Sequence, residues 1–183
     1  FEIFEDKIKF AYDNLPPEIR ERFPLETCNQ SKMKFAHNGS SIRVATSFRS
    51  GTMHRLHISE FGKICALYPH KAQEVVTGSI PTVPSNGVLV IESTAEGRNG
   101  AFYKMVNTAQ ENYSARKKLS LKDYRFHFYA WWQEPKYRLD SSDVYISEAD
   151  HKNFDDIEEK VWQAMGIKMR LDPDQRAWYV VTR

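Results

Sequence analysis

Two short apolar runs, each ending in polar and acidic residues, dominate the hydrophobic pattern of the chain. The first is a strand-like run from Met53 to Ile58, followed by Ser59 and Glu60. The second runs from Gly87 to Ile91 and leads into the polar segment Glu92–Gly97. Open α/β sheets place their chemistry at the carboxyl ends of their strands. The pair therefore predicts an α/β core with functional groups along one edge, as in nucleotide-hydrolysing proteins.

Helical and strand-like patterns alternate over the rest of the chain. Asn38-Gly39, between Met33–His37 and Ser41–Ala45, predicts a hairpin. Alternation of Tyr124, Phe126 and Phe128 with polar residues predicts another half-buried strand. We expect helices over 3–14, 17–23, 69–77, 101–113 and 153–165, and a last helix after the capping residue Asp172. The helix over 101–113 is expected to bury a stripe formed by Phe102, Met105, Val106, Ala109 and Tyr113.

These elements predict an α/β fold with a mainly parallel sheet, flanking helices and one antiparallel hairpin. Gly62 is expected to break the pattern after the first key strand. We expect a single domain over 1–183, with a core at 33–130 and a helical C-terminal extension at 145–183. Because the chain starts at Phe1 and stops inside a helical pattern at Arg183, we interpret it as a piece of a longer protein.

The amino-acid composition narrows the possible class of protein only slightly. Cys28 and Cys65 are the only cysteines and lie far apart, so we expect no disulfide framework and a reducing, intracellular setting. No stretch approaches the ~20 apolar residues of a membrane helix. The net charge of +2 does not by itself indicate a nucleic-acid binder. The one dense basic stretch, Arg116–Lys118 with Lys122 and Arg125, is interpreted as a solvated helix end.

The acidic strand end is the first candidate for chemistry. A carboxylate such as Glu60 can orient a water in line with a γ-phosphate, and Arg49 can stabilise the charge of a transferring phosphoryl group. Ser93 and Thr94 should lie near the same edge, with Glu92 and Glu96 as flanking acids. Taken singly, each has a simpler interpretation: a solvated acid, a surface arginine, or turn-forming hydroxyls.

Two other residue groups are weaker candidates. His54 and His57 are expected on opposite faces of a strand and have no matching second pair, so we exclude a zinc site with Cys65. Trp131, Trp132 and Tyr137 have side chains that can stack on bases, but core packing is the commoner fate of such aromatics.

Taken in order, these segments resemble the ATPase domain of the large terminase subunit, the DNA-packaging motor of tailed bacteriophages. The resemblance is strongest between residues 48 and 103, and it depends on order and spacing more than on any single motif. The matching segments are Phe48–Thr52, Leu56–Gly62, Pro69–Ser79, Val90–Gly97 and Gly100–Tyr103, with weaker likeness at 128–137 and 175–179.

This resemblance implies a role for each matched position. Leu56–Glu60 corresponds to the Walker B strand, with Glu60 as the catalytic carboxylate. Ser59 and Glu60 would bind the cofactor ATP and hold Mg²⁺ indirectly, through water. Ser93, Thr94 and Ala95 correspond to the motif that couples hydrolysis to DNA movement. Arg49 corresponds to a loop arginine that, in some members, reaches the neighbouring subunit's nucleotide.

The resemblance also implies a fold and partners. The fold would be P-loop NTPase-like, of the RecA-like (ASCE) kind, and incomplete at its N-terminus. The partners would be double-stranded DNA, the portal protein, the small terminase subunit and further copies in a ring. The isolated fragment would be monomeric and would not bind a membrane. The setting would be the host cytoplasm, with the protein encoded by a virus or prophage.

Three features depart from the family pattern. Ser59 stands where an aspartate is usual, and the first strand carries the polar residues His54, Arg55 and His57. No G-x-x-x-x-G-K-[ST] loop occurs in the 183 residues. The phosphate loop is expected upstream of Phe1 and the nuclease domain after Arg183, so we expect the chain alone to hydrolyse little or no ATP.

Three alternatives remain open. A helicase-type ATPase shares the acidic strand end and a similar Ser/Thr motif, although helicases usually carry a second ATPase-like lobe. An inactive scaffold or interaction module would have kept the sheet and lost the phosphate loop. A generic α/β domain would match these motifs by chance.

Overall fold

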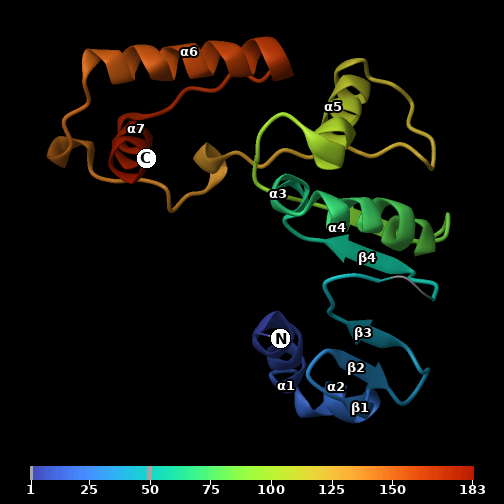
Figure 1. The fold of residues 1–183 in the computed structure, drawn as a ribbon. Coiled ribbons are helices and arrows are strands. Elements are labelled where there is room, and N and C mark those ends of the chain that lie inside the picture. Colours follow the sequence, from blue (N-terminus) through green and yellow to red (C-terminus); the bar gives the residue numbers. More distant parts are fainter. Residues whose placement is uncertain (1, 49–50) are drawn as a thin grey trace. The chain divides into compact units, whose positions relative to one another are not determined.

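The computed structural model describes residues 2–48 and 51–183, in which the strands lie between residues 25 and 91 and the longest helices begin at residue 100 or later (Figure 1). Two units can be separated, Phe1–Lys104 and Met105–Arg183, and each is described by itself. The expectation of one domain with a core at 33–130 and an extension at 145–183 stays a prediction. The N-terminal unit contains, in order, a π-helical segment Phe4–Lys9, α1 Phe10–Asp13, α2 Pro17–Arg22, β1 Leu25–Cys28, β2 Lys32–Phe35, β3 Ser41–Arg43, β4 Arg55–Ile58, α3 Phe61–Leu67, α4 Pro69–Glu74, a π-helical segment Val75–Ser79, a 3-10 turn Ile80–Thr82 and β5 Val88–Ile91.

The remaining elements belong wholly or mostly to the C-terminal unit. Helix α5 begins at Gly100 in the N-terminal unit and continues to Ser114. It is followed by 3-10 turns at Trp131–Gln133 and Ser141–Asp143, then by α6 Glu148–Met165 and α7 Pro173–Thr182.

The predicted hairpin is confirmed and belongs to an antiparallel sheet of order β1-β2-β3. Met33 in β2 is opposite Ile42 in β3. The turn is held by the Asn38 side chain, which accepts hydrogen bonds from the Ser40 N–H and hydroxyl, and Gly39 adopts a φ of 69°. Strand β1 was not predicted, because its residues Leu25–Cys28 are mostly exposed and show no apolar alternation.

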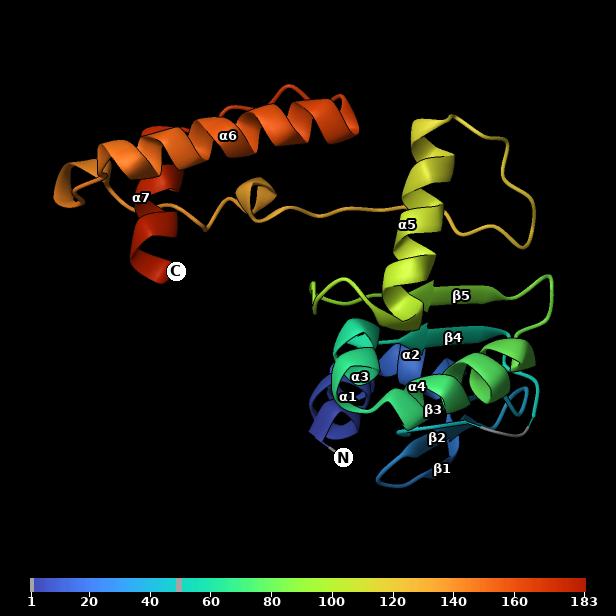
Figure 2. The same cartoon turned by 45° about the horizontal axis from the view of Figure 1, so that its top comes forward.

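The two key strands form a parallel pair, as the sequence predicts. Strands β4 and β5 pair in register, with Leu56 opposite Leu89 and Ile58 opposite Ile91. Leu56 and Ile58 are buried, whereas Val88 and Val90 are about half exposed. Figures 1 and 2 show α3 and α4 beside this sheet. The α/β class is thus confirmed, although the parallel part among the described residues is limited to this pair.

Local capping signals correctly predicted the end of α6 and the start of α7. Gly166 ends α6 with a φ of 65°, and Asp172 caps α7 through the Gln175 N–H, with Pro173 in the first turn. Helix α6 starts at Glu148 rather than Asn153, because Ser147 caps it by accepting from the Asp150 N–H. Its polar first turn carries no apolar periodicity.

The aromatic residues of the C-terminal unit pack on one another. The rings of Tyr137 and Trp178 stack with centroids 4.2 Å apart, and Trp131 lies against Trp178 and Tyr179. Trp132 contacts the ring of Trp131. These rings therefore pack on one another, but none of the three belongs to the buried core, because Trp131 and Trp132 are half-buried and Tyr137 is 38% exposed.

Two predictions in this part of the chain are wrong in whole or part. Of the predicted α5 stripe, only Ala109 is buried, and Tyr113 is 56% exposed. The segment 124–128 is extended, but it is not a strand. Tyr124 and Phe126 are half-buried and alternate with exposed polar residues, as predicted, but Phe128 is 48% exposed. Among the described residues, the backbone of this segment has no hydrogen-bonding partner. A strand requires such a partner, and alternation alone does not supply one.

Both cysteines are free, with Cys28 exposed and Cys65 buried, so the expectation of no disulfide framework is confirmed. Within residues 2–48 and 51–183, no helix combines the length and apolar character needed to cross a membrane.

A carboxylate organises the turn that follows α5 and gives a prediction for acid pH. Asp123 accepts hydrogen bonds from the Ser120 N–H at 2.8 Å and the Ser120 hydroxyl at 2.7 Å, and it lies 3.3 Å from Lys117 Nζ. Hydrogen bonding from the Ser120 N–H, then from its hydroxyl and from Lys117, lowers the pKa of Asp123 from 3.8 to about 2.

Because this pKa is lower in the folded chain, the carboxylate stabilises the turn fully above pH 3.8, and this contribution is lost as the pH falls through about 2. We expect NMR titration of the Asp123 carboxyl to give a midpoint near 2. Ser120→Ala should move this midpoint towards 3.8, because it removes the hydroxyl donor but keeps the N–H. An unshifted midpoint in the unsubstituted chain would contradict this geometry.

Candidate active site at the ends of two parallel strands

The carboxyl ends of β4 and β5 lie at the same edge of their sheet. Because the strands are parallel and Ile58 is opposite Ile91, the segments that follow them leave the sheet side by side. Ser59 and Glu60 follow the first strand, and Glu92 begins the segment after the second. The structure therefore gives the two candidate segments the shared edge that the sequence predicts.

Glu60 occupies a strained turn between β4 and α3. Its φ of 53° and ψ of 39° lie in the left-handed region, which a non-glycine residue seldom adopts. Glu92 holds both ends of this turn: its N–H donates to the Ile58 carbonyl at 3.0 Å, and its carbonyl accepts from the Phe61 N–H at 3.1 Å. The neighbouring strand thus fixes the backbone from which the Glu60 side chain projects.

The Glu60 carboxylate meets two hydroxyls from the second segment. Oε2 accepts from the hydroxyl of Ser93 at 3.4 Å and from that of Thr94 at 3.3 Å. Both distances exceed the ~2.7–2.8 Å of a strong O–H···O bond, so the contacts are loose. Glu60 and Thr94 are exposed, and the Glu60 Oε1 has no partner among the described residues. An exposed, positioned carboxylate with one free oxygen can orient a water molecule.

Gly62 brings α3 close to this second segment. It was expected to break the pattern, but it lies inside α3, and that expectation is wrong. A Cβ at this position would be 2.8 Å from Ser93 Oγ, 3.1 Å from the Thr94 carbonyl oxygen and 3.1 Å from the Phe102 ring. The glycine is required by these distant neighbours and not by a turn.

We expect Gly62→Ala to destabilise the chain by about 1–3 kcal/mol, although alanine favours helices, because the added methyl overpacks a tight contact. Urea unfolding would measure this change. The double variant Gly62→Ala/Ser93→Ala removes the nearest clashing atom and should recover part of the loss, giving a favourable coupling energy. A single variant that is more stable than the unsubstituted chain would show that this contact is not tight.

An ion pair that the sequence did not predict lies beside the site. His57 Nε2 lies 3.4 Å from Glu92 Oε1, and both side chains are largely exposed. The strand register explains the contact: His57 is opposite Val90, so Glu92 is its diagonal neighbour on the same face. The pair could have been found by aligning the two runs at their ends. It forms only when the imidazole is protonated.

Among the described residues, Ser59, Ala95 and Glu96 form no side-chain hydrogen bond or ion pair with Glu60. Arg49 lies outside the described residues, so its predicted catalytic role stays a prediction. Ala95 and Glu96 are exposed, and Ser59 is exposed without a hydrogen-bonding partner among the described residues. The predicted roles of Ala95 in coupling and of Ser59 in cofactor binding are likewise untested.

The donor set around Glu60 fits magnesium only in part. Mg²⁺ prefers oxygen ligands, usually one or two carboxylates together with waters and substrate phosphates. The Glu60 carboxylate and the Ser59 hydroxyl are donors of this type, suited to contacts through water. In the described part of the chain, no group of three or more His, Cys, Asp or Glu side chains could hold a metal ion. Phosphate oxygens would therefore have to supply most of the remaining coordination.

Comparisons with protein-family models, curated proteins and solved structures gave no match to this chain.

Proposed function

We propose that this chain is part of the ATP-hydrolysing motor of a phage terminase large subunit, which moves double-stranded DNA into procapsids. The observation that carries the proposal is the convergence of Glu60 with Ser93 and Thr94 at the ends of two parallel strands. These are the segments that resemble the Walker B strand and the coupling motif. Ser93 and Thr94 lie 33 and 34 residues after Glu60 in the sequence, so local structure alone does not explain their contacts with its carboxylate.

The geometry supports different roles for the segment after β4 and the segment after β5. Glu60 orients the water that attacks the γ-phosphate, a role that needs a rigidly placed carboxylate. Its backbone is held by Glu92, which provides this rigidity. Ser93 and Thr94 contact the same carboxylate, so a change at the phosphate can move the segment that follows β5 and then α5. Loose contacts at 3.3–3.4 Å suit groups that exchange partners during a cycle.

The proposal includes the rest of the predicted machinery. Mg²⁺ with ATP is the cofactor, with Ser59 and Glu60 as the contacts from this chain. Arg49 stabilises transition-state charge, and Ala95 belongs to the coupling segment. The P-loop NTPase-like fold, the ring of copies on the portal protein, the small terminase subunit and the host cytoplasm are parts of the same proposal. Because the 183 residues contain no phosphate loop, we expect the isolated chain to be inactive.

The test is ATP turnover by the longer protein to which we assign this chain, with and without duplex DNA. Turnover that DNA stimulates and that depends on Glu60 would support a packaging motor. Unwinding of duplex DNA would favour the helicase-type ATPase instead. A longer protein that neither binds nor hydrolyses ATP would favour the inactive scaffold.

A further inference from the structure

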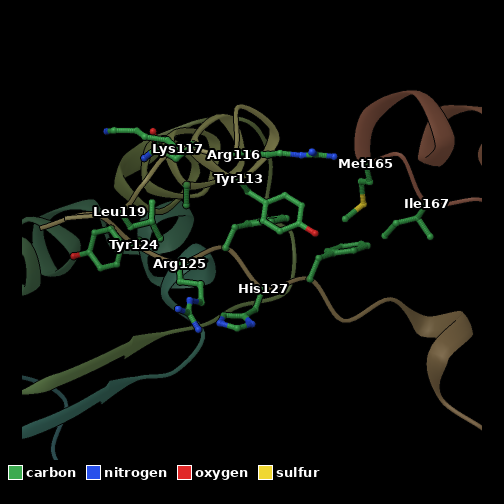
Figure 3. Close-up of a pocket in the computed structure, with 13 residues that line it drawn as sticks. Tyr113, Arg116, Lys117, Leu119, Tyr124, Arg125, His127, Met165 and Ile167 are labelled. Atoms are coloured by element: carbon green, nitrogen blue, oxygen red, sulfur yellow. The ribbon is translucent and has the colours of Figure 1, made fainter. Parts of the chain in front are cut away.

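A cavity of about 530 Å³ lies in the C-terminal unit (Figure 3). None of the residues that line it belongs to the candidate active site around Glu60. Its walls come from the last turns of α5, from the extended segment 124–128 and from Met165 and Ile167. In Figure 3, Tyr113 and Arg116 lie on the α5 side, and Arg125 and His127 lie on the side of the extended segment.

Four aromatic rings line this cavity, those of Tyr113, Tyr124, Phe126 and Phe128. The rings of Phe126 and Phe128 are nearly parallel, at 5°, with centroids 6.5 Å apart. Tyr113 is 56% exposed and Phe128 is 48% exposed, so much of their ring surface faces solvent. Burial raises the pKa of Tyr124, which is consistent with a place on the inner wall. Exposed ring faces next to one another form a stacking surface for planar ligands.

The cavity is also positively charged. Arg116, Lys117 and Arg125 line it together with His127, and no lining residue is acidic. The Lys117 ammonium is paired with Asp123 at 3.3 Å. Neither arginine has an acidic partner among the described residues, so both guanidinium groups are free to bind an anion. The site therefore combines stacking faces with unneutralised cations.

We propose that this cavity binds single-stranded nucleic acid, with bases stacking on Phe126 and Phe128 and backbone phosphates held by Arg116 and Arg125. Stacking platforms interleaved with cations are the usual means of binding unpaired strands. Bases inside a duplex already stack on each other and present only their edges and phosphates, so a duplex would leave these rings unused. The basic stretch, interpreted above as a solvated helix end, thereby gains a binding role.

This site goes beyond the proposed function, which concerns duplex DNA and ATP. Its test needs neither ATP nor Glu60, so one proposal can fail without the other. The probe is a fluorescent oligothymidylate of about 12 nucleotides, titrated with the 183-residue chain and followed by anisotropy. Titrations at two salt concentrations separate the ionic part of the affinity from the stacking part.

Phe128→Leu keeps an apolar side chain but removes the ring, and we expect it to weaken binding roughly tenfold, as for one lost stacked base. Arg116→Gln should weaken binding and lower the salt slope by about one. Phe126→Leu is a second variant that removes a ring, and Arg125→Gln is a second variant that removes a positive charge. Circular dichroism of each variant checks that its fold is kept.

The matched controls lie outside the cavity. Tyr145→Leu removes a ring that is 86% exposed, and Arg170→Gln removes one exposed positive charge. Neither should weaken binding appreciably, and a duplex of the same length should bind less tightly than the single strand. The proposal is overturned by absence of oligothymidylate binding, by equal losses in the control variants, or by a duplex that binds as tightly as the single strand.

Discussion

Under the proposed function, replacing Glu60 with Gln in the terminase large subunit to which we assign this chain is expected to lower ATP turnover by about a hundredfold or more. The amide keeps the size of the side chain and can still accept from the Ser93 and Thr94 hydroxyls at one oxygen. It lacks the negative charge and the second acceptor oxygen, which are the features that orient and polarise a water molecule. Steady-state phosphate release measures turnover, and a fluorescent ATP analogue measures binding, which should be retained.

Glu96→Gln is the matched control for this experiment. Glu96 is an exposed acid in the segment that carries Ser93 and Thr94, but it does not contact Glu60. We expect its replacement to leave turnover near that of the unsubstituted protein. Equal turnover in the Glu60 variant and the unsubstituted protein would reduce β4 to an ordinary strand and favour the scaffold interpretation. Loss of nucleotide binding in the Glu60 variant would indicate a binding role in place of water orientation.

Phe61→Ala should lower the stability of the N-terminal unit by about 3–5 kcal/mol. The Phe61 side chain is fully buried and packs edge-to-face on Phe102, with centroids 6.3 Å apart. Its removal leaves a cavity beneath the first turn of α3, directly after the strained Glu60. We therefore expect faster hydrogen exchange in β4 and α3 as well as a lower free energy of unfolding in urea.

Leu67→Ala provides the control within the same helix. Leu67 is 58% exposed, so its truncation should change stability by about 0.5 kcal/mol or less. All 4 tryptophans lie between residues 131 and 178, so their fluorescence reports on the C-terminal unit, whereas hydrogen exchange of β4 and α3 reports on the N-terminal unit. Equal costs for the two substitutions would show that Phe61 is not part of a packed core.

Elements with local signals could be predicted from the sequence. The parallel strands were found because apolar runs of strand length ended in polar residues, and the hairpin because Asn38-Gly39 suits a turn with positive φ. The start of α7 was found because Asp172 and Pro173 are a capping pair. In each case the information lies within a few residues, since capping and turn formation depend on the immediate backbone.

Elements that depend on distant partners could not be predicted in this way. Segment 124–128 has the alternation of a strand but no strand beside it among the described residues. Gly62 suggests a break, yet the structure places it inside a helix that approaches Ser93 and Thr94. A hydrophobic pattern records which side chains avoid water, but it does not record which surface covers them.

The sequence by itself therefore determined the α/β class, the two key strands and the identity of the acid at the end of the first. Tertiary structure decided how that acid is held: Glu92 fixes its strained backbone, and two hydroxyls from the second segment reach its carboxylate. It also decided that rings and free arginines near the end of α5 line one cavity. The physical reason is the same in both cases, because hydrogen bonds and packing join residues whose separation in the sequence carries no local signal.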